Sequence, residues 1–403
     1  MPRNFSDICL TSQQMRMYGN EAEKYLQRYF YPCVALFGLA GNLINLTVLL
    51  NRSMRSRSNC LLAALALSDI IFLILLFPNI LANYPIFTNS YYYRYLYFYS
   101  KVHLISLANW SSCVAIWCVI AVCTDRLVGI RRPLYIITEW KWYRLPLILT
   151  TIVVCTGLVT FYQHFQYECL VRSYCKGTQI FSKCIAINND GRWFGNRTNP
   201  FSASYRKLID ISVMVNAISM VLLPIFLLTV LNLMLLCIVR NRATGLLLES
   251  DAPHSDSRSS SIYGRRRRST KDGQCQLQKT EQRVTLTVTL IVTMFTITNG
   301  PSAVVHLIQI AHPQQQIYNM TLLCNTLVIC GKACNFIVFC LSSKHFRSRL
   351  FLLTKRKMSR RFAKLSTGVL DMTVTAQRRA NSRAQHSISN PLLLTNRRSA
   401  DLS

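Results

Sequence analysis

The amino-acid sequence predicts an all-α membrane protein, a seven-transmembrane helix bundle with a short amphipathic helix after the seventh span. The chain of 403 residues is 51% hydrophobic. Seven apolar runs are each long enough, at about 20 residues, to cross a bilayer as a helix. Together these runs contain two formally charged residues, Asp69 and Lys332. The runs, which bound a bundle over 29–340, are 29–50, 60–83, 102–124, 145–164, 211–239, 284–311 and 317–339.

The charge of the chain sets its expected orientation. There are 46 Lys and Arg against 16 Asp and Glu, a formal net charge of +30. In a soluble protein this excess would indicate nucleic-acid binding, but here the bases lie outside the apolar runs, so no nucleic-acid partner is expected. With the N-terminus outside, the inner segments hold 32 Lys and Arg and the outer segments 13. This asymmetry predicts a multi-pass plasma-membrane protein with its N-terminus outside.

The segments outside the spans are polar. Residues 1–28 are expected to form a mobile extracellular tail, and residues 241–280, with the basic block Arg265–Arg268, a disordered inner loop. Residues 343–354 form an amphipathic stretch that should lie along the inner membrane surface, in contact with lipids. The basic tail 355–403 is expected to be disordered and cytoplasmic.

Three glycosylation sequons lie on or near the expected outer side and support this orientation. They begin at Asn4, Asn196 and Asn319.

The third apolar run ends in Asp125-Arg126, followed by Pro133-Leu134. An adjacent acid and base cannot stay in hydrocarbon, so they mark the water boundary, and Pro133 ends the helix. Five other runs each carry a short motif of their own, in the order Gly41-Asn42, Leu65-Ala66-Leu67-Ser68-Asp69, Leu223-Pro224, Phe295 to Pro301, and Asn335-Phe336-Ile337-Val338-Phe339. Jointly they resemble the rhodopsin-like (class A) G-protein-coupled receptors.

The resemblance implies signal transduction to a heterotrimeric G protein, with arrestin and kinases acting at the tail. Arg126 would pair with Glu281 in the inactive state, and Leu134 would insert into the G protein. Pro301 kinks the sixth helix and lets its inner end move. The chain departs from the family at Asn299, which replaces a Trp, and at Phe339, which replaces the Tyr that follows Asn335 by four residues.

A buried polar core is expected from Asn42, Asp69 and Lys332. An isolated charge at mid-bilayer costs roughly 2.5 to 3.5 kcal/mol, so Asp69 should be protonated or paired. In the family this Asp binds sodium, whereas here the seventh helix supplies Lys332, whose ammonium is expected to take the place of the ion. Alternatively, Lys332 turns toward a water-filled cavity or a carbonyl group.

The disulfides also depart from the family. The third-helix Cys of the family is replaced by Lys101, so its usual bridge cannot form. Four cysteines are expected outside, and they allow three pairings that the sequence does not distinguish: Cys9, Cys169, Cys175 and Cys184. A bridge within the second outer loop, from Cys169 or Cys175 to Cys184, is expected.

The ligand is expected to be an extracellular peptide. Amine receptors place an Asp where this chain has Ala108, and the outer loop resembles invertebrate FMRFamide-type neuropeptide receptors from Phe161 to Cys184. An amidated peptide ending in Arg-Phe would need a carboxylate for its Arg and an aromatic slot for its Phe. Candidate ligand-binding residues are Asn79, His103, Asn109, Tyr162, Glu168, Asp210, His306 and Gln309.

Two alternatives stay open. A chemosensory receptor for a small molecule would share the same motifs. A transporter or channel would use Asp69 and Lys332 as a proton relay, although no repeat between the halves of the chain supports it. No catalytic constellation, phosphate-binding loop or metal-ligand cluster is visible, so neither an enzyme, a cofactor nor a metal is expected.

Overall fold

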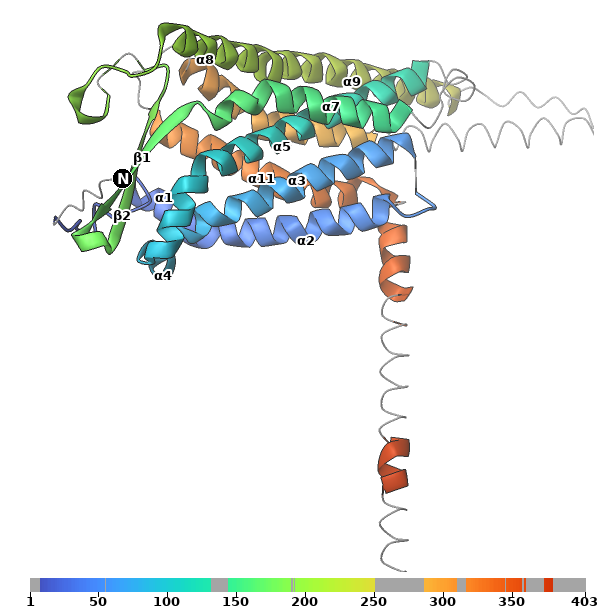
Figure 1. The fold of residues 1–403 in the computed structure, drawn as a ribbon. Coiled ribbons are helices and arrows are strands. Elements are labelled where there is room, and N and C mark those ends of the chain that lie inside the picture. The colour runs from blue at the N-terminus through green and yellow to red at the C-terminus, as the bar shows by residue number, and fades with distance from the viewer. Residues whose placement is uncertain are drawn as a thin grey trace, which may run out of the picture. The chain divides into compact units, whose positions relative to one another are not determined.

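The computed structural model describes residues 8–54, 56–131, 144–189, 191, 193–250, 286–309, 317–344, 346–356, 359 and 373–379. Seven helices in these ranges are long and apolar enough to cross a membrane. The chain divides into two units, Met1–Lys344 and His345–Ser403. The first unit is the helix bundle (Figure 1), and in the second the residues 346–356 and 373–379 are helical.

Each span is a helix or a short series of helices. The first consists of α1 (Glu21–Tyr25), η1 (Leu26–Phe30) and α2 (Tyr31–Leu49), and the second is α3 (Arg57–Leu81). The third is α5 (Tyr91–Arg131), and the fourth joins α7 (Arg144–Thr160) to η2 (Phe161–His164). The fifth joins α8 (Ala203–Asn216), η5 (Ala217–Leu222) and α9 (Leu223–Ser250). The last two are Leu286–Gln309 and α11 (Tyr318–Ser342).

In the bundle α3 packs between α2 and α5, α2 in turn contacts α11, and α5 contacts α7 and α9. The approach of α2 to α11 is close at Gly38, where an added Cβ would lie 2.9 Å from the Cα of Ala333. A larger side chain at Gly38 would therefore push the two helices apart.

A β-hairpin covers one end of the bundle. Strands β1 (Tyr167–Tyr174) and β2 (Gln179–Ala186) are antiparallel. In Figure 1 the hairpin lies at the same end as α1 and the short helix α4 (Pro85–Thr88). We call this the hairpin end, and the opposite end, where α5 carries Arg126, the Arg126 end.

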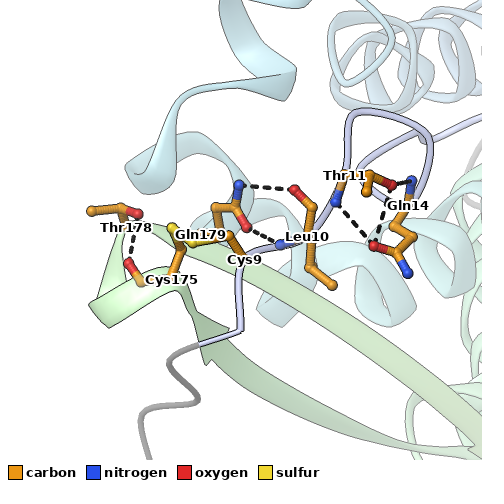
Figure 2. Close-up of a disulfide and its surroundings, with 7 residues drawn as sticks. All are labelled: Cys9, Leu10, Thr11, Gln14, Cys175, Thr178 and Gln179. Carbon is orange, nitrogen blue, oxygen red and sulfur yellow. Dashed lines mark hydrogen bonds between the residues drawn. A yellow bond between two sulfur atoms is a disulfide. The ribbon is translucent and has the colours of Figure 1, made fainter.

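The structure describes the N-terminal segment from residue 8, and the part of the expected tail from Glu21 onward is helical. Cys9 is bonded to Cys175 in the turn of the hairpin. Beside this disulfide the Leu10 N–H donates to Gln179 Oε1 at 2.6 Å, and Gln179 Nε2 donates back to Leu10 O at 3.2 Å (Figure 2). The first helix then begins at Glu21, eight residues before the apolar run at 29.

Three further boundaries differ from expectation. The third helix begins at Tyr91 rather than near 102, because the tyrosine-rich junction is itself helical. The fifth span begins at Ala203, and α9 continues to Ser250, so residues 241–250 of the expected disordered loop are helical. Residues 373–379, expected to be disordered, are also helical.

Two stretches of the bundle are π-helical, η1 in the first span and η5 in the fifth. A π turn adds one residue to a helical turn and is frequent at functional sites. Both lie toward the hairpin end of their spans, and residues of both line the cavity described next.

Candidate functional site

A cavity of about 530 Å³ lies among the helices of the bundle. This volume is within the usual range for small-molecule pockets, about 300–1,000 Å³. Its walls come from all seven spans, the fourth contributing only Gln163 of η2. A ligand in the cavity would therefore contact several helices at once.

Several polar side chains of the cavity are held by partners on other helices. Asn109 Nδ2 donates to Gln163 Oε1 at 2.9 Å, which links α5 to η2. Gln309 Nε2 donates to Thr321 Oγ1 at 2.9 Å, which links the sixth and seventh spans. The Tyr31 hydroxyl lies 2.9 Å from Thr326 Oγ1. These bonds fix the shape of the cavity near the hairpin end.

The cavity reaches down to the polar core of the bundle. Phe72, Phe295 and Asn299 line it. Lys332 Nζ lies 4.6 Å from the centre of the Phe72 ring and 3.1 Å from Asp69 Oδ1. A ligand that moves Phe72 would thereby act on the ammonium of Lys332.

The polar core joins three helices. Asn335 Nδ2 donates to Asp69 Oδ2 at 2.6 Å, and Asn42 Nδ2 donates to the Lys332 carbonyl at 3.0 Å. Asn42, Asp69, Lys332 and Asn335 are all buried. The structure thus brings together the polar residues that the sequence assigns to this core, and the Lys332 ammonium faces the Asp69 carboxylate.

Four of the eight ligand-binding candidates line the cavity: Asn79, Asn109, His306 and Gln309. The other four are not among the lining residues. His103 Nδ1 lies 2.9 Å from His164 Nδ1, and Tyr162 lies in η2. Glu168 is on strand β1, and Asp210 accepts a hydrogen bond from Asn188 at 2.7 Å.

The two acids expected to bind the ligand, Glu168 and Asp210, do not line this cavity. Asp210 follows the buried Ile209 on α8, and a rotation of about 100° per helical residue turns it to the exposed side. Glu168 is exposed on the hairpin. Both acids lie outside the apolar runs that carry the motifs, so the motif spacing does not predict which way their side chains face.

Glu23 and Gln27 line the cavity but were missed, because they fall in the segment assigned to the tail. A signal for them is present in the sequence. Asn20 stands three residues before Glu23, a pattern that marks the start of a helix, and in the structure the Glu23 N–H donates to Asn20 Oδ1 at 2.8 Å. Asn216, Ser112, Thr296 and Asn325 are further polar lining residues that the sequence did not single out.

At the Arg126 end, Ser58 lies between the two residues of the Asp-Arg motif. Its hydroxyl donates to Asp125 Oδ2, and Arg126 Nε donates to Ser58 Oγ at 2.6 Å. Arg57 lies 4.0 Å from the other carboxylate oxygen of Asp125. Pro133, Leu134 and Glu281 lie outside the described residues, so the expected pair of Arg126 with Glu281 stays a prediction.

At the hairpin end, two disulfides are formed. Cys169 and Cys184 face each other across the hairpin and are bonded, one of the two bridges expected within the loop. Cys9 pairs with Cys175. Of the sequon residues, Asn196 and Asn319 are exposed, while Asn4 lies outside the described residues.

Arg94 of α5 links the third helix to the hairpin through hydrogen bonds. Neither of the two disulfides makes this link. Its side chain is 1% exposed. Nε donates to the Ile180 carbonyl at 2.8 Å, and one terminal nitrogen donates to the carbonyls of Met15, at 3.0 Å, and Thr88, at 3.3 Å. One guanidinium therefore joins α5, the hairpin and the N-terminal segment.

This fold and site define a seven-transmembrane G-protein-coupled receptor, and comparison with known proteins agrees. The chain is 36% identical over 378 residues to a putative G-protein-coupled receptor of Caenorhabditis elegans, covering 94% of this chain and 84% of that protein. It is 30% identical over 109 residues to a probable G-protein-coupled receptor of the same organism, covering 27% of this chain and 25% of that protein.

The model of the serpentine seven-transmembrane chemoreceptor family Srw matches residues 29–357, and the chain belongs to this family. Membership implies an extracellular ligand, coupling to a G protein and a multi-pass position in the plasma membrane. The comparisons support a G-protein-coupled receptor of the chemoreceptor family. They do not extend to the more specific resemblance to rhodopsin-like or FMRFamide-type receptors.

Proposed function

We propose that this protein is a chemoreceptor for a small extracellular molecule that binds in the cavity and activates a heterotrimeric G protein at the Arg126 end. In this proposal the hairpin end is outside the cell. The observation that carries the proposal is the cavity, whose 530 Å³ suits a small molecule and whose lining mixes apolar side chains with a few polar groups. Membership of a chemoreceptor family supports the same class of ligand.

Two observations support the proposed orientation. The disulfides Cys9–Cys175 and Cys169–Cys184 lie at the hairpin end, and disulfides persist in oxidising compartments such as the cell exterior. The exposed sequon residues Asn196 and Asn319 belong to the same end of their spans. We further propose that arrestin and kinases act on the tail, which follows the last span on the cytoplasmic side.

The route from ligand to G protein would run through the centre of the bundle. A ligand in contact with Phe72, Phe295 or Asn299 biases how these side chains pack. Phe72 lies against the Lys332 ammonium, and Lys332 and Asn335 both bind Asp69. A ligand shifts the receptor only if it binds the two arrangements of this core with different affinity.

An amidated neuropeptide is a second candidate, favoured by one observation. The cavity contains a carboxylate, Glu23, together with the aromatic rings of Tyr31, Phe72 and Phe295. These groups supply what an Arg-Phe-amide terminus needs, a partner for the guanidinium and an aromatic slot. The cavity would then hold the end of the peptide, and the hairpin would contact the rest.

The test is a screen in cells that express the receptor with a promiscuous G protein, with calcium as the readout. Small volatile and water-soluble compounds form one arm, and amidated peptides form the other. Activation by a small compound supports the chemoreceptor, and activation by peptides alone supports the second candidate. Ligand-dependent currents in cells without the G protein would instead identify a transporter or channel.

A pair of variants tests whether the cavity is the binding site. Gly300 lines the cavity, and a Cβ added there meets open space, so the side chain of Gly300→Leu starts in the cavity and takes up part of its volume. Val304, on the same helix, is 56% exposed, which makes Val304→Leu a matched control. We expect Gly300→Leu to abolish the response and Val304→Leu to preserve it. A full response from Gly300→Leu would place the ligand elsewhere.

A further inference from the structure

We propose that the ligand carries a positive charge, a protonated amine or a guanidinium, which binds the carboxylate of Glu23. This inference rests on the proposed function in one respect, that the ligand occupies the cavity. It adds the chemical class of the ligand and the residue that selects it.

The charge of the cavity points to a cation. Among the described lining residues, Glu23 is the one acid, and none is Lys or Arg. The bases near it on the first span have other partners. Lys24 Nζ binds Glu21 at 2.7 Å, and Arg28 Nε donates to the Asn83 carbonyl at 2.8 Å. Lys101 of α5 lies within Coulombic range of Glu23 but does not line the cavity. Glu23 is therefore the charged group that a guest meets among the described lining residues, and a carboxylate favours a cation.

Hydrogen bonds to one of its two oxygens hold the carboxylate of Glu23 in place. Oε2 accepts hydrogen bonds from the Gly19 N–H at 2.6 Å and from the Tyr318 hydroxyl. Gly19 permits this approach, since an added Cβ would lie 2.7 Å from the Tyr318 hydroxyl. Within the described part of the chain, Oε1 accepts no hydrogen bond. A fixed carboxylate with one oxygen available is suited to bind a donor without rearranging.

A second acceptor lies one turn further along the same span. Gln27 lines the cavity and is 5% exposed, and its Oε1 is buried without a hydrogen-bond partner among the described residues. An unsatisfied buried acceptor is unfavourable unless a ligand or another group donates to it. A carboxylate and an amide oxygen together match the three donors of an ammonium or the fork of a guanidinium.

Asn216 supplies a third acceptor on another wall. It lies at the end of α8, is 6% exposed, and its Oδ1 is buried without a partner among the described residues. We assign it to a further N–H or O–H group of the same ligand. The third helix, by contrast, presents Ala108 to the cavity, so the acid that meets the cation comes from the first span.

The test compares a charged probe with its neutral isostere on purified full-length receptor. The probes are Nα-acetylarginine amide and Nα-acetylcitrulline amide, which differ by a guanidinium and a urea. The readout is the shift in thermal unfolding temperature, because a ligand of the native state stabilises it. The variants are Glu23→Gln, which keeps the size and the acceptor, and Glu21→Gln, an acid of the same helix that does not line the cavity.

We expect the arginine amide to stabilise the wild type and Glu21→Gln, with little effect on Glu23→Gln. The citrulline amide should bind about 10- to 100-fold more weakly. Equal shifts from both probes, no shift from either, or an undiminished shift in Glu23→Gln would overturn the inference. A structural role of Glu23 would lower the melting temperature of Glu23→Gln without changing the preference for the charged probe.

The two proposals fail separately. A receptor that responds in the cell screen to ligands blocked by Gly300→Leu, but equally in Glu23→Gln and wild type, retains the proposed function and refutes the cation site. A receptor that shows charge-selective stabilisation through Glu23, yet activates no G protein with any ligand, retains the cation site and refutes the proposed function.

Discussion

Lys332 Nζ lies 3.1 Å from Asp69 Oδ1 in the middle of the bundle, and the two side chains are 2% and 0% exposed. The carboxylate also accepts from Asn335 at 2.6 Å, so both of its oxygens are bound. An ion pair buried this completely is weak support for stability by itself, because removing both charges is often neutral. Removing one partner is the damaging change.

We therefore expect Lys332→Ala to destabilise the receptor by about 3–5 kcal/mol, because it leaves the Asp69 charge buried without its partner. The measurement is surface expression together with the unfolding temperature in detergent. Adding Asp69→Asn to this variant should restore most of the loss. A single variant as stable as wild type would show that Asp69 does not depend on the ammonium.

Sodium should have no specific effect on this receptor, since the Lys332 ammonium already faces the Asp69 carboxylate. We expect equal unfolding temperatures in sodium chloride and in choline chloride of the same concentration. The double variant Asp69→Asn/Lys332→Ala serves as the background for nonspecific salt effects. Stabilisation by sodium that choline does not reproduce, in the wild type alone, would contradict the expected replacement of the ion.

Arg94→Met should lower stability strongly, because three carbonyl groups in three segments lose their shared donor. Hydrogen bonds to a charged group contribute about 1.5–3 kcal/mol each. Arg172→Met, at an exposed position of β1, is the control and should leave the unfolding temperature nearly unchanged. Equal losses in the two variants would mean that the guanidinium of Arg94 does not hold the hairpin.

Ser58→Ala should raise basal G-protein signalling. The Ser58 hydroxyl joins Asp125 and Arg126, and its loss removes hydrogen bonds to charged groups, of about 1.5–3 kcal/mol each, from the arrangement seen here. We expect a several-fold rise in basal calcium or nucleotide-exchange signal, and loss of all signalling in Arg126→Ala. Ser53→Ala, in the exposed turn before α3, is the control. Lower basal activity in Ser58→Ala would assign the observed arrangement to the active state.

Cys9→Ser should release the N-terminal segment while leaving the hairpin intact. Cys169–Cys184 closes the hairpin independently of Cys9. Amide hydrogen exchange should therefore become faster over residues 8–18 and stay slow over β1 and β2. Unchanged exchange over residues 8–18 would show that the hydrogen bonds of Leu10 and Arg94 hold the segment without the disulfide.

The spans of the bundle were predictable because membrane burial needs long apolar runs, and such runs are visible without any structure. Asp69 and Lys332 were predictable as a pair for the related reason that charges are rare within those runs. The disulfides were predictable only as a set of alternatives. The choice depends on the register of the hairpin, which places Cys169 opposite Cys184.

The ligand site was predictable only in part. Asn79 and Asn109 follow from spacing along apolar helices, but Glu23 and Gln27 precede the first apolar run and carry no hydropathy signal. The π turns add a second difficulty. The π turn of η5 adds an extra residue between Pro224 and the residues of α8. The side of the helix that Asp210 or Asn216 faces can therefore not be obtained from Pro224 with the regular helical period.

The Cys9–Cys175 bond gives the chain a different connectivity from that of its sequence. The bond closes a covalent ring with a sequence separation of 166, and this ring contains the first four spans. A single cut in any loop of the ring leaves the two pieces joined through sulfur. Such a nicked receptor would run as one band on a gel until it is reduced, and only then release its fragments.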